Sequence, residues 1–244
     1  PRHPSLGRRD IVREIVELSR ARGIHPMMYN CAWNVSEEVR RAHPDWAMVV
    51  PNTEDSDSHT DNSICINSGY QDVFVEAIRE VTSRGVDGMF FDGLGLVGKC
   101  RCGKCRSNFR DYCGGDLNKA PEVEIAAWAD EVQRRLGERY CNAVKSVNPD
   151  CFFFVNGLGA GAGAAYSDGL GAEAFFGVRG RFMPPFDDVK AVGRVVSGCA
   201  RPEQVRIVYS RYAQSPWAHQ TNTDAELELA TYRSIASGVE PWYS

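Results

Sequence analysis

The chain has 244 residues, of which 43% are hydrophobic, 25% charged and 10% aromatic. This is the composition of an ordinary globular protein, and it excludes a disordered, fibrous or collagen-like chain. The net charge is −4 and the basic residues are scattered, so nucleic acid and anionic membranes are poor candidates as partners. No apolar run approaches the ~20 residues of a membrane-spanning helix, and we expect a soluble chain.

The number and spacing of the cysteines indicate the cellular compartment, and the first residues indicate whether the N-terminus has been processed. The chain has nine cysteines, an odd number that crowds in one place, which favours reduced thiols in a cytoplasmic compartment over a disulfide framework. The sequence begins at Pro1, without an initiator Met, a signal peptide or a lipidation motif. We therefore expect a processed or trimmed N-terminus.

The first part of the chain alternates helical and strand patterns. Apolar residues at helical spacing are followed by Gly23, by Gly85 or by Asn148-Pro149, which mark where helices end. The short apolar run after each helix indicates a buried parallel strand. The predicted elements are a helix over 10–22, a strand over 24–29, a helix over 70–84, a strand over 86–91, a helix over 121–147 and a strand over 151–155.

The rest of the chain repeats this alternation. We expect strands over 172–176, 205–209 and 239–243, separated by helices over about 186–197 and 224–237. Strands that alternate with helices predict an α/β fold with a parallel sheet. We favour a (β/α)₈ TIM barrel that lacks its first two strands in this chain, so that residues 1–244 form a single barrel domain with strands three to eight. The alternative is an open six-stranded sheet.

Polar residues at strand ends favour the barrel. We place Asp92, Asn156, Glu173, Ser210 and Arg211 at or just beyond the ends of predicted strands. In a barrel, the carboxyl ends of the strands carry the active site. A doubly wound sheet also binds ligands there, but the expected glycine-rich phosphate fingerprint does not follow the first strand.

A cluster of cysteines indicates a metal site. Cys100, Cys102 and Cys105 are spaced C-x-C-x₂-C, which lets one loop and the first turn of a helix direct three thiolates at one point. Tetrahedral Zn²⁺ needs a fourth ligand. The candidates are Cys31, Cys65 and Cys113. A set of free or disulfide-linked thiols is the alternative.

The segment from Cys100 to Tyr112, together with that from Ile64 to Tyr70, resembles the structural zinc site of family 42 β-galactosidases. The resemblance implies a closed, structural zinc site. It also implies that this chain could form a homo-oligomer, since family 42 enzymes often assemble as trimers. The implied zinc ligands are Cys65, Cys100, Cys102 and Cys105.

The catalytic segment resembles other families more closely. Family 42 enzymes carry Asn-Glu at the end of strand four, where this chain has Phe91-Asp92-Gly93. The segment from Val86 to Gly93 is similar to strand four of family 29 α-L-fucosidases, in which the Asp before Gly is the nucleophile. It is more similar still to a group of uncharacterised hypothetical glycosyl hydrolases, and that resemblance covers most of the chain from about Asp10 onward.

Glycoside hydrolysis needs two carboxyl groups, and Asp92 and Glu173 are the best-placed pair. Asp92 follows three apolar residues and suits a nucleophile, although Asp before Gly is also common in turns. Glu173 lies among Ala and Phe residues, and an apolar setting favours a protonated carboxyl group, as a general acid requires. A surface Glu at the start of a strand is the structural alternative.

Sugar sites also use aromatic faces and planar hydrogen-bond donors. The predicted substrate-binding residues are Tyr29, Trp33, Asn156, Arg211, Tyr212 and Trp217. The sequence thus predicts a retaining glycoside hydrolase with a carbohydrate substrate, galactosidase- or fucosidase-like. Two other hypotheses are a non-catalytic carbohydrate-binding barrel that has lost its acid/base, and a zinc-stabilised scaffold without a role in sugar binding.

Overall fold

The computed structural model describes residues 4–51, 63–94, 97–157, 166–176, 187–212 and 223–243. The chain divides into two compact units, Pro1–Phe153 and Phe154–Ser244. Each unit builds its own hydrophobic core.

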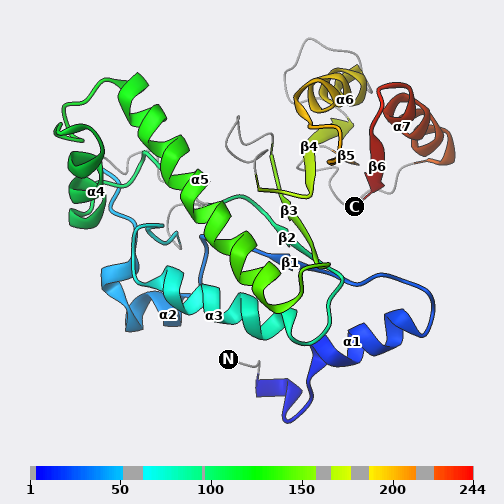
Figure 1. The fold of residues 1–244 in the computed structure, drawn as a ribbon, viewed down its shortest axis with the longest axis horizontal. Coiled ribbons are helices and arrows are strands. Elements are labelled where there is room, and N and C mark those ends of the chain that lie inside the picture. The colour runs from blue at the N-terminus through cyan, green and yellow to red at the C-terminus, as the bar shows by residue number, and fades with distance from the viewer. Residues whose placement is uncertain are drawn as a thin grey trace. The chain divides into compact units, whose positions relative to one another are not determined.

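The first unit alternates helices with short parallel strands (Figure 1). Its elements are α1 (Ile11–Arg20), β1 (Met27–Asn30), α2 (Glu37–Ala42), α3 (Tyr70–Thr82), β2 (Gly88–Phe91), α4 (Gly103–Cys113), α5 (Glu122–Val147) and the start of β3 (Phe152–Val155), with 3₁₀ helices at Pro4–Leu6 and Pro44–Trp46. The helices and strands predicted in this part are confirmed, with ends shifted by up to three residues. Helix α2 was not predicted, because it buries none of its residues and so lacks an apolar pattern.

Aromatic side chains form the core of the first unit, where α3 and α5 lie side by side (Figure 1). Phe91 of β2 and Phe153 of β3 are fully buried, with ring centroids 5.0 Å apart. Tyr140 of α5 stacks on Phe91 at 5.4 Å, and Phe74 of α3 packs against Tyr140 at 5.3 Å. These separations are favourable for aromatic pairs. The core therefore fixes the carboxyl end of β2, and Asp92 is the next residue.

The amino end of β2 is fixed by an ion pair. The Asp87 carboxylate accepts a hydrogen bond from Arg20 at 2.6 Å and lies 3.0 Å from Nδ1 of His25. Because the Arg20 guanidinium stabilises the charged form, the pKa of Asp87 is held below its ordinary value. The contact joins the amino end of β2 to α1 and to the segment before β1. The two acids that bracket β2 thus lie in different settings.

The second unit repeats the alternation. After the end of β3 its elements are β4 (Gly169–Phe176), α6 (Asp187–Cys199), β5 (Val205–Tyr212), α7 (Asp224–Ala236) and β6 (Glu240–Tyr243). Strands β4 and β5 are parallel, with Ala172 opposite Val208. One face of these strands packs on helices α6 and α7. The buried residues of this core are Ala172, Ala174, Val189, Val196, Val208, Ala230 and Val239.

Strand β4 begins three residues before the predicted start at 172, because the glycines at its beginning hide the strand pattern. A Cβ atom at Gly171 would lie 2.7 Å from both the Ile207 carbonyl oxygen and the Phe154 ring. Only glycine fits this close approach of neighbouring strands. The extension moves Glu173 from the predicted start of the strand to its interior.

The hydrogen-bonded order of the described strands is β1-β2-β3-β4-β5-β6, the order in which they occur in the chain. The pairs β1–β2, β3–β4, β4–β5 and β5–β6 are parallel. Parallel strands in sequential order with helices between them are arranged as in part of a (β/α)₈ barrel. The predicted α/β class with six parallel strands is therefore confirmed.

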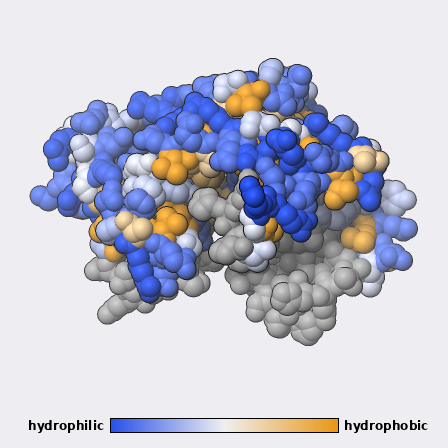
Figure 2. Space-filling view, turned by 90° about the horizontal axis from the view of Figure 1, so that it is seen from below, coloured by the Kyte–Doolittle hydropathy of each residue, from blue (hydrophilic) through white to orange (hydrophobic). Residues whose placement is uncertain are grey.

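Hydrophilic residues predominate on the face shown in Figure 2, where hydrophobic residues occur in small separate groups. Among the described residues, no helix has both the length and the apolar character that crossing a membrane requires.

Candidate functional site

Asp92 lies directly after β2, at the carboxyl end of the strand pair β1 and β2. Its backbone N–H donates to the Asn30 carbonyl at 2.8 Å, which continues the ladder by one residue. Its carboxylate Oδ2 accepts a hydrogen bond from the Tyr29 hydroxyl at 2.5 Å. Tyr29 is 58% exposed, lies opposite Phe90 in the register and packs on the ring of Phe90. The half-buried carboxylate is thus held by an exposed phenol from the neighbouring strand.

The backbone of Asp92 is fixed by a second aromatic residue. The indole N–H of Trp33 donates to the Asp92 carbonyl oxygen at 3.0 Å. The chain then turns through Gly93, whose φ of +75° is a conformation that L side chains rarely adopt. Tyr29 and Trp33, both predicted as substrate-binding, therefore contact the predicted nucleophile within the protein.

Cys31 lies in the same region and not in the cysteine cluster. Burial raises the pKa of the Cys31 thiol, backbone N–H groups of Trp33 and Asn34 lower it, and the charge of Asp92 raises it further. Cys31 is not among the four cysteines whose sulfurs lie together, so it is not the fourth ligand of the cluster.

The cluster consists of Cys65, Cys100, Cys102 and Cys105, whose sulfur atoms all lie within 4.8 Å of one another. The Cys65 sulfur lies 3.5 Å from that of Cys102 and 3.4 Å from that of Cys105, so no disulfide joins them. Cys65 lies in the loop before α3, and the other three lie in the β2–α4 connection and the first turn of α4. Cys113 is exposed at the end of α4, where its thiol donates to the Phe109 carbonyl. The fourth member is therefore Cys65.

The cluster fits a tetrahedral thiophilic cation. With Zn–S bonds of about 2.3 Å, the sulfurs of a tetrahedral site lie about 3.8 Å apart. N–H groups surround the sulfurs: Val49 N–H donates to Cys100 at 3.4 Å, Asn67 Nδ2 to Cys105 at 3.3 Å, and the Cys105 N–H to Cys102 at 3.4 Å. Such N–H donors stabilise thiolates. Four sulfur donors leave no open coordination position, so the donor set is that of a structural site.

Crowding of the thiols determines which of them ionises first. Cys100 accepts hydrogen bonds from Cys105, Cys65 and the Val49 N–H, which lower its pKa. The thiol of Cys65 donates to that charge, and its pKa is raised by those hydrogen bonds and by burial. One thiolate therefore forms readily, whereas several thiolates at such distances require a cation.

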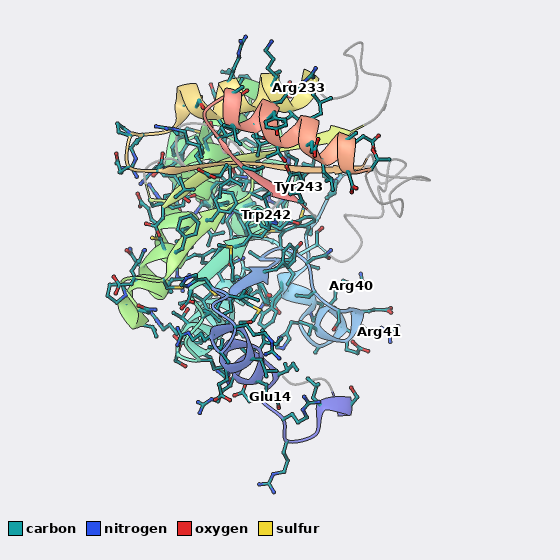
Figure 3. The ribbon with its side chains drawn as sticks, turned by 90° about the vertical axis from the view of Figure 1, so that its right-hand side faces the viewer. Glu14, Arg40, Arg41, Arg233, Trp242 and Tyr243 are labelled. Atoms are coloured by element: carbon teal, nitrogen blue, oxygen red, sulfur yellow. The ribbon has the colours of Figure 1, made fainter. Side chains whose placement is uncertain are left out.

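Glu173 is the fifth of the eight residues of β4, three before the end of the strand. Its neighbours Ala172 and Ala174 pack in the core with α6, so the half-buried Glu173 lies on the opposite face of the strand. The register places Tyr209 of β5 opposite Glu173, and Trp242 of β6 opposite Tyr209. Trp242 and its neighbour Tyr243 are labelled on β6 in Figure 3. Glu173 therefore belongs to a row with two aromatic residues.

The remaining predicted residues fall into three groups. Asn156 directly follows β3 and is half-buried, in agreement with the predicted position at a strand end. Arg211 and Tyr212 are the last two residues of β5, so they lie within the strand and not beyond it. Trp217 lies outside the described residues.

Sequence reasoning did not anticipate the partners of these residues. The Asn67 side chain on the Cys105 sulfur and the Trp33 indole on the Asp92 carbonyl each join segments far apart in the chain. The available signal for Tyr29 was its place in a short strand, one residue before the end of β1.

Comparisons with known proteins support a glycosidase-like fold. Residues 1–93 match a family model described as hypothetical glycosyl hydrolase 6. No curated protein matches the chain. The solved structures that it resembles include alpha-L-fucosidase isoenzyme 2 from Paenibacillus thiaminolyticus, with 19% identity and a TM-score of 0.73. That match covers 96% of this chain and 36% of the fucosidase.

Two β-galactosidases are similar to the same extent. The cold-adapted enzyme from Rahnella sp. R3 has 12% identity and a TM-score of 0.72, and the match covers 99% of this chain and 43% of that one. The enzyme from the psychrophilic Marinomonas ef1 has 8% identity and a TM-score of 0.74, with 96% and 46% covered. This chain thus spans less than half of each of these proteins. The predicted resemblance to glycoside hydrolase-like barrels is confirmed.

Proposed function

We propose that this chain forms part of a glycoside hydrolase in which Asp92 is the nucleophile of a retaining reaction. The observation that carries the proposal is the Asp92 carboxylate at the carboxyl edge of β2, held by the Tyr29 hydroxyl at 2.5 Å. A nucleophile must be both accessible and oriented, and a half-buried carboxylate at a strand end, with a hydrogen bond from a neighbouring phenol, supports both. The family-model match over residues 1–93, which include Asp92, supports this reading.

The reaction needs a second carboxyl group, and we propose Glu173 for that role. In the first step Asp92 attacks the anomeric carbon, the bond to the leaving oxygen breaks, and Glu173 gives its proton to that oxygen. In the second step Glu173 takes a proton from water, and the resulting hydroxide displaces Asp92 to release the sugar. The sugar keeps its anomeric configuration, because each step inverts it once.

Zinc is the cofactor that the four cysteines fit, and its proposed role is structural. The metal would join the loop that carries Cys65 to the start of α4, which carries Cys102 and Cys105. The protein residues alone then perform the proton transfer and the nucleophilic attack. We expect about one zinc per chain, which elemental analysis measures.

The proposed substrates are β-galactosides or α-L-fucosides, because the similar solved structures bear those names. The location of Glu173 inside β4, and not at its end, favours one other function, a carbohydrate-binding barrel without an acid/base. That protein would bind sugars without hydrolysing them. The cytoplasmic location and the homo-oligomer stay predictions from the sequence.

The decisive experiment traps the intermediate. Incubation of the full-length protein with 2-fluoro glycosyl fluorides of the galactose and fucose series leaves a glycosyl ester on the nucleophile, which peptide mass spectrometry locates. We expect the label on Asp92, and loss of hydrolysis of the matching aryl glycoside by about 10³-fold or more in Asp92→Asn. A label on another residue, or full activity of the variant, refutes the assignment.

Asp87→Asn is the matched control, because it makes the same change at the other end of β2. Asp87 contacts Arg20 and His25 and has no part in the proposed chemistry. We expect this variant to keep its activity. Sugar binding by calorimetry without any turnover supports the binding barrel instead.

A further inference from the structure

The segment that follows β1 connects the cysteine cluster with Asp92. On one side, the Trp33 carbonyl accepts a hydrogen bond from the Ile64 N–H at 2.9 Å, and Asn34 pairs with Ser63 in an antiparallel bridge. On the other side, the Trp33 indole N–H donates to the Asp92 carbonyl at 3.0 Å. Trp33 thus makes hydrogen bonds at its backbone and its side chain to two different sites.

The segment that pairs with Trp33 carries a member of the cluster. Cys65 follows Ile64, is 1% exposed, and has its sulfur 3.4 Å from that of Cys105. Its backbone N–H donates to the Trp46 carbonyl at 2.8 Å, which leaves the loop little freedom on that side. The hydrogen bond from Ile64 to Trp33 therefore lies one residue from a sulfur of the cluster.

The orientation of Asp92 depends in turn on Trp33. Asp92 is the first residue beyond β2; its N–H donates to the Asn30 carbonyl at 2.8 Å, and the N–H of Gly93 donates to the Phe91 carbonyl at 2.9 Å. The Trp33 indole N–H holds the carbonyl oxygen of the peptide between Asp92 and Gly93, so Asp92 has a partner at its backbone as well as at its carboxylate. A half-buried tryptophan thus contacts the backbone of a residue with a half-buried carboxylate.

We propose that Trp33 is a positioning residue that transmits the state of the four-cysteine cluster to Asp92. With a thiophilic cation such as zinc in the cluster, the Ser63–Cys65 segment holds Trp33 in place, and its indole orients the Asp92 peptide. Loss of the cation loosens that segment and releases the indole from Asp92. The role of Asp92 in this inference rests on the proposed function, whereas the link between the cluster and the Trp33 indole does not.

The link is measured by NMR of the indole N–H groups in the full chain, with zinc bound and after removal by a chelator. Trp33→Phe assigns the signal. We expect metal removal to shift the Trp33 signal and to accelerate its hydrogen exchange at least tenfold. Trp128, which packs beside the cluster and donates to Asn108 at 2.7 Å, reports the loss of metal, and Trp242 on β6 is the unaffected reference.

Kinetics on the full-length protein test the consequence for Asp92. Trp33→Phe keeps an aromatic ring and removes the N–H, and we expect a kcat about tenfold lower with KM and zinc content unchanged. Chelation of the metal should lower the kcat of the wild type by a similar factor. In Trp33→Phe, chelation should cause little further loss of kcat.

The two proposals fail in different ways. A Trp33 signal that is the same with and without zinc overturns the present inference, even if Asp92→Asn is inactive. An active Asp92→Asn refutes the proposed function, while a metal-dependent Trp33 signal still supports the link. If chelation lowers kcat by the same factor in the wild type and in Trp33→Phe, transmission through Trp33 is refuted.

Discussion

Substitution of Cys105 by Ser should remove zinc from the cluster and lower the stability of the first unit. The sulfurs lie within 4.8 Å of one another, close to the separation of about 3.8 Å in a tetrahedral site, so binding needs little rearrangement. The free energy of metal binding then adds to the free energy of unfolding. Removal of an outer contact of a metal site already weakens binding about 10- to 100-fold, and loss of a sulfur should exceed this.

The size of the effect follows from linkage. With zinc in excess, a 100-fold weaker binding constant lowers the free energy of unfolding by about 2.7 kcal/mol. For a chain of this length that corresponds to roughly 5–11 °C in Tm. Calorimetry at fixed free zinc measures the shift, and elemental analysis measures the metal, which should fall from about one equivalent to well below one.

Cys113→Ser is the matched control for Cys105→Ser. It makes the same chemical change on the same helix, at an exposed thiol outside the cluster. Its zinc content and Tm should match the wild type. Equal zinc content in both variants, or metal-free wild-type protein whose four cluster thiols titrate as free, would refute the metal site.

Three further predictions concern single side chains. Glu173→Gln should lower kcat about 10²- to 10⁴-fold for substrates with poor leaving groups and far less for activated aryl glycosides. Kinetics with a series of leaving groups measures this difference, and an equal loss of kcat for all substrates would contradict the role of Glu173 as the acid. Tyr29→Phe removes the hydrogen bond to Asp92 and should lower kcat/KM about tenfold, because a hydrogen bond to a charged group contributes about 1.5 kcal/mol. An unchanged kcat/KM would contradict a role of this contact in catalysis. The pKa of Asp87 is lowered in the folded state, so its ionised carboxylate stabilises the fold at every pH above its unfolded pKa of about 3.9. This stabilisation is lost as the pH falls through the lower pKa of the folded state. Asp87→Asn should therefore cost about 0.5–1 kcal/mol at pH 7 and progressively less below about pH 4 in denaturant titrations, and a pH-independent cost would be inconsistent with this ion pair.

Local sequence patterns determined the elements and their class. The helix over Tyr70–Thr82 and the strand over Gly88–Phe91 follow from apolar spacing and from the glycine between them, which act within a few residues. The position of Asp92 just beyond β2 could be predicted for the same reason. The spacing of Cys100, Cys102 and Cys105 likewise indicated a metal site, since the three lie on one loop and one helical turn.

Only the tertiary structure decided which distant residues meet. It selected Cys65 over Cys31 and Cys113, placed Glu173 inside β4, and set the Trp33 indole on Asp92 across 59 positions in the chain. The spacing of apolar residues indicates which face of a helix or strand is buried. It does not indicate which other helix or strand packs against that face. Contacts between loops depend on the packing of the whole unit, so the partners that hold the cluster and Asp92 follow from the fold and not from the local pattern.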